Sequence, residues 1–163
     1  MVTTTDFRNG MALLTGAVNI ITTAGPAGQA GFTASAVCSV TDQPPTLLVC
    51  VNRSAYSHGL LLANRKLCVN VLGSHQQHLS ALFADRNVSM EQRFGGTPWS
   101  ILHTGSPALD GALANFDGEV VHTHEVGTHT VFYAELRQVR LAEAPHSGLA
   151  YFDRCYHPVE RPH

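Results

Sequence analysis

Residues 28–52 read GQAGFTASAVCSVTDQPPTLLVCVN and contain two strand-like runs with a Pro-Pro corner between them. Alternate positions of the first run are apolar, namely Phe32, Ala34, Ala36, Cys38 and Val40. The other face carries mostly small and hydroxyl-bearing residues, namely Gly31, Thr33, Ser35, Val37 and Ser39. Since successive side chains of a strand point to opposite faces, we expect the apolar face to join a core. The second run, Thr46–Val51, is apolar on both faces, which is typical of a buried strand.

The small face of the first run and the end of the second run together suit a flat, phosphorylated ligand. Small residues let a planar ring approach the backbone, and hydroxyls and free amides can bond to its edge. The second run ends in Asn52-Arg53-Ser54, and a helix-like segment follows with Ser57 near its start. Hydroxyls, an arginine and a helix N-terminus suit a phosphate. A ring on one strand and a phosphate at the end of the next describe a flavin nucleotide.

Composition restricts the chain to a few classes of protein. With 163 residues, we expect one domain, 1–163, with a substantial core. Only 13% of residues are charged, about half the usual fraction for soluble domains, which favours burial against a second copy. The formal net charge of −2 and the absence of a basic run argue against nucleic acid and anionic membranes as partners. No apolar stretch reaches the roughly 18 residues needed to span a bilayer.

The cysteines and histidines predict neither a disulfide framework nor a metal site. Cys38, Cys50, Cys68 and Cys155 lie far apart without a CxxC pair, so we expect buried, reduced thiols in a cytoplasmic protein. The first residues, MVTTTDFRNGM, lack the features of a secretory signal. Two histidine pairs could each offer two nitrogens to a metal, His122 with His124 and His75 with His78, but no further ligand stands at a convincing spacing. Surface histidines are the preferred interpretation.

The rest of the chain predicts further strands with helices at intervals. We expect helices over 5–15 (packed on the outside of the domain), 55–64, 74–84 and, briefly, 88–94, and strands over 17–23, 66–72, 112–126, 130–141 and 149–152. Residues 97–111 carry turn signals and are expected to be irregular, and 154–163 form a polar, proline-punctuated tail. This spacing favours a barrel-like β core. No GxGxxG follows a strand, which argues against a doubly wound dinucleotide-binding fold.

The chain resembles the short-chain flavin reductases of two-component monooxygenases, which belong to the flavin-reductase-like, FMN-binding split-barrel group. Two branches are most similar: reductases paired with hydroxyphenylacetate-type monooxygenases, and those of pyrimidine degradation. The combination of GFTAS (31–35), PPTLLVCVNRS (44–54) and GTH (127–129) is specific, whereas each motif alone is weak. Further matching segments are FRNGMALLTGAVNIITT (7–23), LCVNVL (67–72), LSALFA (79–84), RF (93–94) and LAYFDRCYHPV (149–159).

The resemblance implies a mainly β fold: a six-stranded antiparallel split barrel of Greek-key type with a few peripheral helices, assembled as a homodimer. It implies an NAD(P)H-dependent oxidoreductase in which reduced nicotinamide passes hydride to N5 of FMN or FAD. The reduced flavin would then leave for a partner oxygenase. The sequence does not separate FMN from FAD, or NADH from NADPH.

The resemblance also assigns roles to individual residues. Thr33, Ala34, Ser35 and Ala36 would line the flavin ring edge, with Ser39 further along the same run. The phosphate would be bound by Asn52, Arg53, Ser54 and Ser57, and the pocket shaped by Phe83, Arg93 and Phe94. Tyr156, with His157 beside it, would cover the flavin or the nicotinamide. His129 would approach the nicotinamide side of the flavin as the catalytic residue, in its neutral form.

Two alternatives use the same barrel. One is a flavoenzyme that retains its flavin and reduces another acceptor, such as a corrin cobalt. The other is a flavin-binding module without enzymatic activity. Flavin-dependent oxidation of reduced nicotinamide separates the reductase from both.

Overall fold

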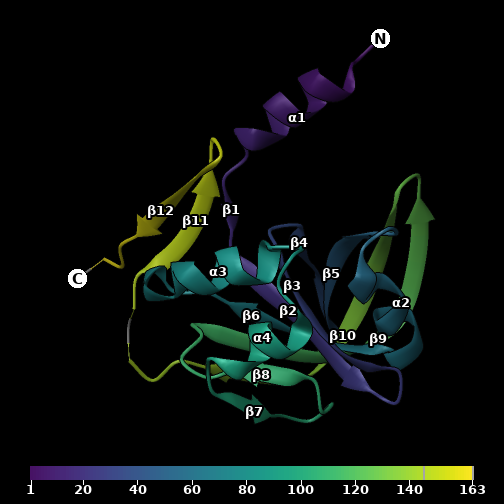
Figure 1. Ribbon diagram of the computed structural model, residues 1–163, viewed down its shortest axis with the longest axis vertical. Coiled ribbons are helices and arrows are strands. Elements are labelled where there is room, and N and C mark those ends of the chain that lie inside the picture. Colours follow the sequence, from purple (N-terminus) through teal and green to yellow (C-terminus); the bar gives the residue numbers. More distant parts are fainter. Residues whose placement is uncertain (145, 163) are drawn as a thin grey trace.

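The computed structural model describes residues 1–144 and 146–162 and is mainly β (Figure 1). Its centre is a seven-stranded antiparallel sheet with the order β3-β2-β6-β9-β10-β5-β4. These strands are β2 (Asn19–Gly25), β3 (Gly28–Ala34), β4 (Val37–Asp42), β5 (Pro45–Asn52), β6 (Lys66–Val71), β9 (Ala114–Val126) and β10 (His129–Leu141). The end strands β3 and β4 do not pair with each other, so the sheet is open. The mainly β, split architecture is confirmed, with seven strands rather than six in this sheet.

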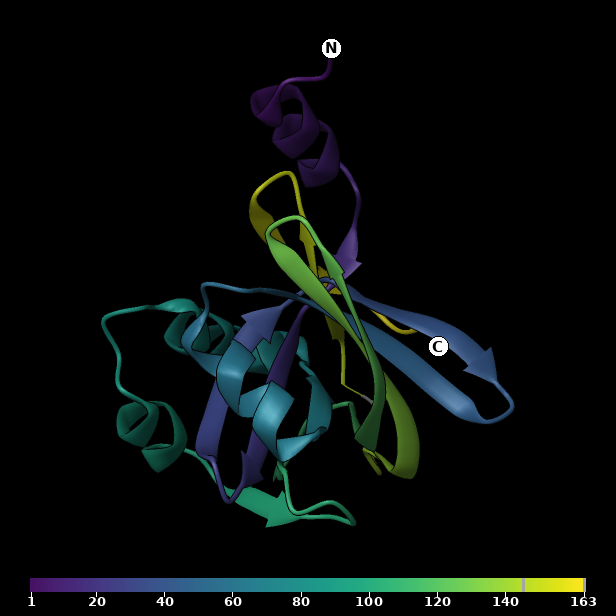
Figure 2. The same ribbon diagram turned by 90° about the vertical axis from the view of Figure 1, so that its right-hand side faces the viewer.

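The additional strand arises within the 31–40 run, which the sequence pattern predicted to be continuous. β3 ends at Ala34 and β4 begins at Val37, and the two lie at opposite edges of the sheet. Phe32 and Ala34 pack partly against the core, but Ala36, Cys38 and Val40 are exposed. The expected core face is therefore wrong beyond Ser35, because β4 and β5 form a hairpin that extends from the body (Figure 2).

Two apolar clusters lie on opposite faces of the sheet. The neighbours Ile20 and Ile21 on β2 are both fully buried and belong to different clusters, as the alternation of a strand requires. Ile21 packs with Phe132 of β10 and with Leu61 of α2 (Tyr56–Asn64). Ile20 packs with Leu79 and Phe83 of α3 (Gln77–Ala84). These helices are thereby fixed on opposite faces.

The shorter elements match the expectations in part. The 55–64 and 74–84 helices are present, the latter as a 3-10 turn η1 (Ser74–Gln76) followed by α3, and α4 (Met90–Gly95) follows. The expectation of an irregular 97–111 segment is wrong in part, because β7 (Trp99–Ile101) and β8 (Pro107–Leu109) pair there. Strands of three residues are too short to show a period of two in the sequence.

The C-terminal segment is also more regular than expected. β12 (Cys155–Val159) pairs with β11 (Gly148–Phe152), which pairs with β1 (Gly16–Ala17). The prediction of a tail without a strand is wrong because Pro158 lies in β12, the edge strand of this small sheet, where a missing backbone N–H is tolerated.

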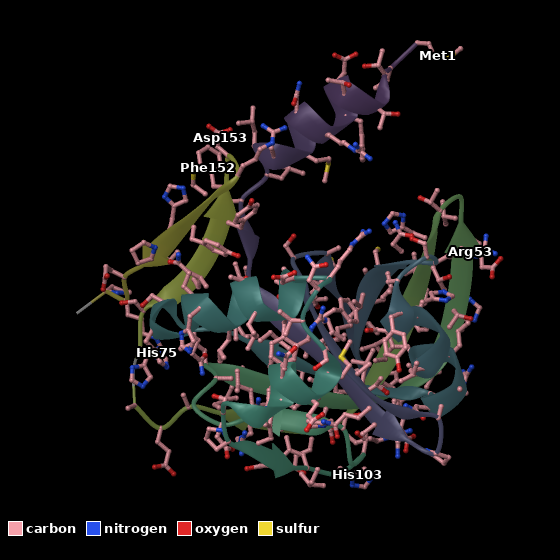
Figure 3. The ribbon with its side chains drawn as sticks, viewed as in Figure 1. Met1, Arg53, His75, His103, Phe152 and Asp153 are labelled. Carbon is pink, nitrogen blue, oxygen red and sulfur yellow. The ribbon has the colours of Figure 1, made fainter. Side chains whose placement is uncertain are left out.

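The N-terminal helix α1 (Thr4–Ala12) projects from the body (Figures 1 and 2). A capping box between Thr3 and Asp6 begins it, but none of its residues is buried. Phe7 and Met11 are 60% and 47% exposed, so the expected packing of this stripe on the domain is wrong for a single copy of the chain. The C-terminal end of α1 lies beside the β11–β12 turn, where the backbone N–H of Asp153 donates to the carbonyl of Ala12 (Figure 3).

The four cysteines are free thiols, but the expectation that they are buried is confirmed only for Cys68. Burial raises the pKa of the Cys68 thiol well above its usual range. Cys38 and Cys155 are exposed, and Cys50 is half-buried. None of the helices among the described residues has the length and apolar character needed to cross a bilayer.

Candidate flavin-binding site

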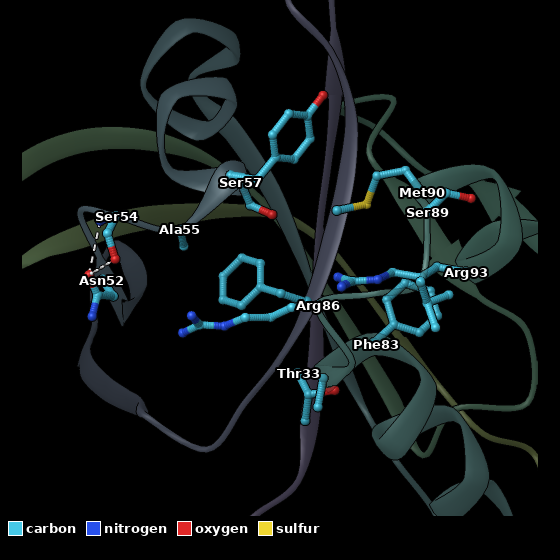
Figure 4. Close-up of a pocket in the computed structure, with 14 residues that line it drawn as sticks. Thr33, Asn52, Ser54, Ala55, Ser57, Phe83, Arg86, Ser89, Met90 and Arg93 are labelled. Atoms are coloured by element: carbon cyan, nitrogen blue, oxygen red, sulfur yellow. Dashed lines mark hydrogen bonds between the residues drawn. The ribbon is translucent and has the colours of Figure 1, made fainter.

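A cavity of ≈ 720 Å³ opens beside β3, between the start of α2 and the segment that joins α3 to α4 (Figure 4). This volume lies in the range typical of small-molecule and cofactor sites. Its lining residues are Phe32, Thr33, Asn52, Ser54, Ala55, Tyr56, Ser57, Phe83, Ala84, Arg86, Val88, Ser89, Met90 and Arg93. The cavity therefore gathers three segments that are distant in the sequence.

A second, smaller cavity of ≈ 230 Å³ shares Thr33 and Ala84 with the first. Its lining residues are Val18, Thr33, Ala34, Ser35, Ser80, Ala84, Tyr151 and Tyr156. The Tyr156 hydroxyl is 2.7 Å from that of Ser80, and the Thr33 hydroxyl donates to the Ser80 carbonyl at 2.7 Å. The two cavities thus follow the open edge of β3, which pairs only with β2 and leaves outward backbone groups for a ligand.

The start of α2 contributes polar groups to the larger cavity. The Asn52 side-chain oxygen accepts from the Ser54 backbone N–H at 2.9 Å and from the Ser54 hydroxyl at 2.8 Å, which fixes the turn out of β5. Ala55 is the N-cap residue and provides no side-chain cap. The first amides of α2 therefore keep their partial positive charge, and Ala55, Tyr56 and Ser57 bring them to the cavity wall.

Among the residues that the structure describes, two arginines and no acidic residue line the larger cavity. Arg93 is only 7% exposed, and its guanidinium donates to the carbonyls of Gly31 at 2.7 Å and Asp85 at 2.6 Å. Its Nε is buried without a hydrogen-bond partner among the described residues, and burial lowers the pKa of this arginine. A cavity with uncompensated positive charge fits an anionic ligand such as a flavin phosphate.

Nine of the sequence-predicted residues line these cavities. Thr33, Asn52, Ser54, Ser57, Phe83 and Arg93 line the larger one, and Thr33, Ala34, Ser35 and Tyr156 the smaller one. The other predicted residues, Ala36, Ser39, Arg53, Phe94, His129 and His157, line neither. Phe94 instead packs against Phe83 and Trp99, behind the cavity wall. Ser39 is exposed on β4, at the opposite edge of the sheet from β3.

Arg53 and His129 lie beside the larger cavity, at the ends of β5 and β10. The Arg53 guanidinium donates to the Gly127 carbonyl at 3.4 Å and is 3.8 Å from a Glu125 carboxylate oxygen, so it is directed to the β9–β10 turn (Figure 3). His129 is exposed, and strand pairing places it opposite Asn52, whose side chain lines the cavity. The His129 Nδ1 is 2.9 Å from the Thr128 hydroxyl.

His58 connects the start of α2 to β10 and was not singled out in the sequence. Its Nε2 is 2.8 Å from the Thr130 hydroxyl, and its ring meets Phe132 edge to face. Burial, reinforced by the Arg53 charge, lowers the pKa of His58, so the neutral ring is favoured. This contact holds the helix that carries Ser57 against the strand that carries His129.

Sequence reasoning also missed further polar and aromatic lining residues, among them Tyr56, Ser80, Arg86, Ser89 and Tyr151. No periodic pattern identifies them, because Arg86 and Ser89 lie in a short connection and Tyr151 on a strand far along the chain. Within residues 1–144 and 146–162, no group of three or more His, Cys, Asp or Glu side chains could hold a metal ion. Of the histidine pairs considered, His75 also contacts His146, and His122 packs against Tyr133.

Comparisons with known proteins agree on one family. The family model described as "Flavin reductase like domain" matches residues 11–160. An FMN reductase (NADH) named RutF, from Yersinia enterocolitica, is 54% identical over 156 residues, which cover 96% of this chain and 85% of the relative. The styrene monooxygenase flavin reductase of Pseudomonas putida is 30% identical with a TM-score of 0.85, covering 96% of this chain and 99% of that one. BorF, the flavin reductase component of a bacterial two-component tryptophan halogenase, is 27% identical with a TM-score of 0.90, covering 98% of this chain and 100% of that one.

Proposed function

Because the chain belongs to the flavin reductase-like family, we propose that it oxidises NADH and reduces FMN, which then leaves for a partner oxygenase. The observation that carries the proposal is the pair of adjoining cavities along the open edge of β3, which share Thr33 and Ala84, and the two arginines that line the larger one. A planar ring and a phosphate require these two environments next to each other. The FMN reductase and two-component relatives favour this activity over the retained-flavin and non-enzymatic alternatives.

In this proposal the flavin ring lies along Thr33, Ala34 and Ser35, whose outward backbone groups and hydroxyls can bond to its polar edge. The phosphate lies near Asn52, Ser54 and Ser57, at the start of α2. Phe83 and Arg93 form one wall of the site, and Phe94 supports it from behind through its contacts with Phe83 and Trp99. The proposal does not use the predicted contacts of Ala36, Ser39 and Arg53, which line neither cavity. The residues of the chain bind and orient the flavin and exclude water from it.

When bound, the flavin supplies the N5 atom that accepts hydride from the reduced nicotinamide. Because hydride transfer takes no proton from the protein, His129 can orient the nicotinamide amide through a hydrogen bond without acting as a base. In this proposal Tyr156, whose hydroxyl is bonded to that of Ser80 and which lines the smaller cavity, covers the ring from the β11–β12 side. No Ser-His-Asp arrangement is required by this chemistry.

We also propose a homodimer in the cytoplasm. A helix of nine residues is marginal in water by itself, yet α1 buries none of its residues. It exposes Phe7 and Met11, and the segment directly after it exposes Leu13 and Leu14. A second copy packed on α1 and the neighbouring β11–β12 hairpin would cover this apolar surface. Exposed free thiols at Cys38 and Cys155 suit a reducing compartment. Sedimentation velocity of the purified chain tests the dimer, and a monomer at micromolar concentration contradicts it.

The activity is tested by following NADH absorbance with the purified protein, with and without FMN, FAD or riboflavin, and by repeating the assay with NADPH. We expect oxidation only when flavin is added, fastest with FMN and with NADH. Flavin binding without oxidation of either nicotinamide would refute the reductase and favour a carrier or a dedicated acceptor. Tight retention of the flavin through gel filtration would argue against delivery to an oxygenase.

A further inference from the structure

An arginine outside the Asn52-Arg53-Ser54 motif lines the part of the larger cavity where the phosphate is proposed to bind. Arg86 lies in the connection between α3 and α4, and its side chain points into the cavity, on the side where Asn52 and Ser54 lie (Figure 4). Arg53, the arginine of the motif after β5, is not among the lining residues. The two arginines therefore occupy different positions relative to the proposed phosphate.

The three arginines near the cavity also differ in whether their guanidinium groups already have bonding partners. The Arg53 guanidinium donates a hydrogen bond to the Gly127 carbonyl and forms an ion pair with the Glu125 carboxylate. Both terminal nitrogens of Arg93 are held by backbone carbonyls. Among residues 1–144 and 146–162, no ion pair or side-chain hydrogen bond engages the Arg86 guanidinium. Of these three arginines, Arg86 alone lines the cavity with terminal nitrogens that are still available to an anion.

The backbone around Arg86 is fixed even though its side chain is exposed. The Asp85 carbonyl accepts from Arg93 and from the backbone N–H of Val88, and the Asp85 carboxylate accepts from the N–H of Asn87 at 2.9 Å. The Ser89 capping box then begins α4. A guanidinium on a fixed turn loses less freedom when it binds a ligand than one on a mobile loop.

From this arrangement we infer that Arg86 is the specificity-determining residue for the phosphate of the flavin, binding it across the cavity from Ser54, Ser57 and the first amides of α2. A guanidinium can form a bidentate, charge-assisted contact with a phosphate, and the helix start supplies the opposing donors. This inference rests on the proposed function and adds a prediction about the ligand: FMN is distinguished from riboflavin chiefly through Arg86. Riboflavin carries the same ring without the phosphate.

The experiment measures dissociation constants of FMN and riboflavin by quenching of flavin fluorescence, without nicotinamide, for the wild type, Arg86→Ala, Arg86→Lys and Arg53→Ala. We expect Arg86→Ala to weaken FMN binding by about 10- to 100-fold, the range for loss of a charge-assisted contact, and riboflavin binding by less than about twofold. Arg86→Lys should recover part of the FMN affinity. Arg53→Ala should retain more of the preference for FMN over riboflavin than Arg86→Ala does.

Equal weakening of FMN and riboflavin by Arg86→Ala, or weakening of neither, would overturn the inference. So would a wild type that binds FMN no better than riboflavin. An unchanged FMN affinity with a raised KM for NADH would assign Arg86 to the dinucleotide phosphates instead. Since binding is measured without turnover, a wild type that prefers FMN through Arg86 but oxidises no NADH would refute only the proposed function.

Discussion

Arg93→Ala should destabilise the fold measurably, because this buried arginine joins three segments around the cavity. Its guanidinium connects α4 to Gly31 on β3 and to the Asp85 carbonyl at the end of α3. Hydrogen bonds that involve a charged group contribute about 1.5–3 kcal/mol each. Removing both contacts costs about 3–6 kcal/mol before any compensation.

Part of that cost is offset because the substitution also removes a buried nitrogen that has no hydrogen-bond partner among the described residues. The Arg93 Nε is buried without a partner among the described residues, and such a group costs about 1–3 kcal/mol. The net loss is then about 3 kcal/mol, which corresponds to a Tm decrease of about 6–12 °C for a chain of this length.

Differential scanning fluorimetry at fixed protein concentration measures this difference, with Arg86→Ala as the matched control. Arg86 is a nearby arginine whose guanidinium has no hydrogen bond in the described structure, so its removal should change Tm by less than about 1 °C. Arg93→Lys should recover little stability, because a single ammonium group does not reproduce the fork that reaches both carbonyls. A Tm for Arg93→Ala within about 1 °C of the control would refute the role of Arg93 as a structural connection.

Three further predictions address the site and the core. His129→Ala should lower kcat while the FMN dissociation constant changes little, and an unchanged kcat would contradict its role. The pKa of His58 lies below its usual value in the folded chain, so the unfolded chain takes up the proton first as pH falls below about 6.5. Acidification below that pH should therefore lower the free energy of unfolding measured in urea. This decrease should be smaller in His58→Gln. An equal pH dependence of stability in the wild type and in His58→Gln would contradict the contribution of His58. Asn70→Leu should cost about 3 kcal/mol or more in urea unfolding, because the fully buried Asn70 bonds to Asn115 at 2.7 Å and to the Ile20 carbonyl at 2.9 Å, and a cost below about 1 kcal/mol would contradict this.

The sequence predicted nine of the residues that line the two cavities, because the signals for them are local. Asn52 and Ser54 are two residues apart, and their bonded turn positions Ser57 at the start of α2. The small residues of β3 alternate with apolar ones, and this alternation is visible in the sequence of the 31–40 run. The family resemblance then linked these segments to a flavin, and the comparisons confirmed the family.

Strand pairing between distant segments was not visible in the sequence. The 31–40 run has one uninterrupted alternation, yet its two halves pair at opposite edges of the sheet, with β2 and with β5. The same limit applies to β12, whose strand character depends on β11, and to the apolar side chains of α1, none of which is buried in the described part of the chain.

The sequence by itself determined the mainly β class, the helices α2 and α3, the turn that follows β5 and the family. Only the tertiary structure decided that Arg86 lines the cavity while Arg53 is directed away from it, and that Arg93 reaches Gly31 across 62 positions of the chain. The physical reason is range. Capping, turn chemistry and periodicity act over a few neighbouring residues, whereas the direction of an exposed arginine depends on which carbonyls and carboxylates the folded chain brings within hydrogen-bond distance.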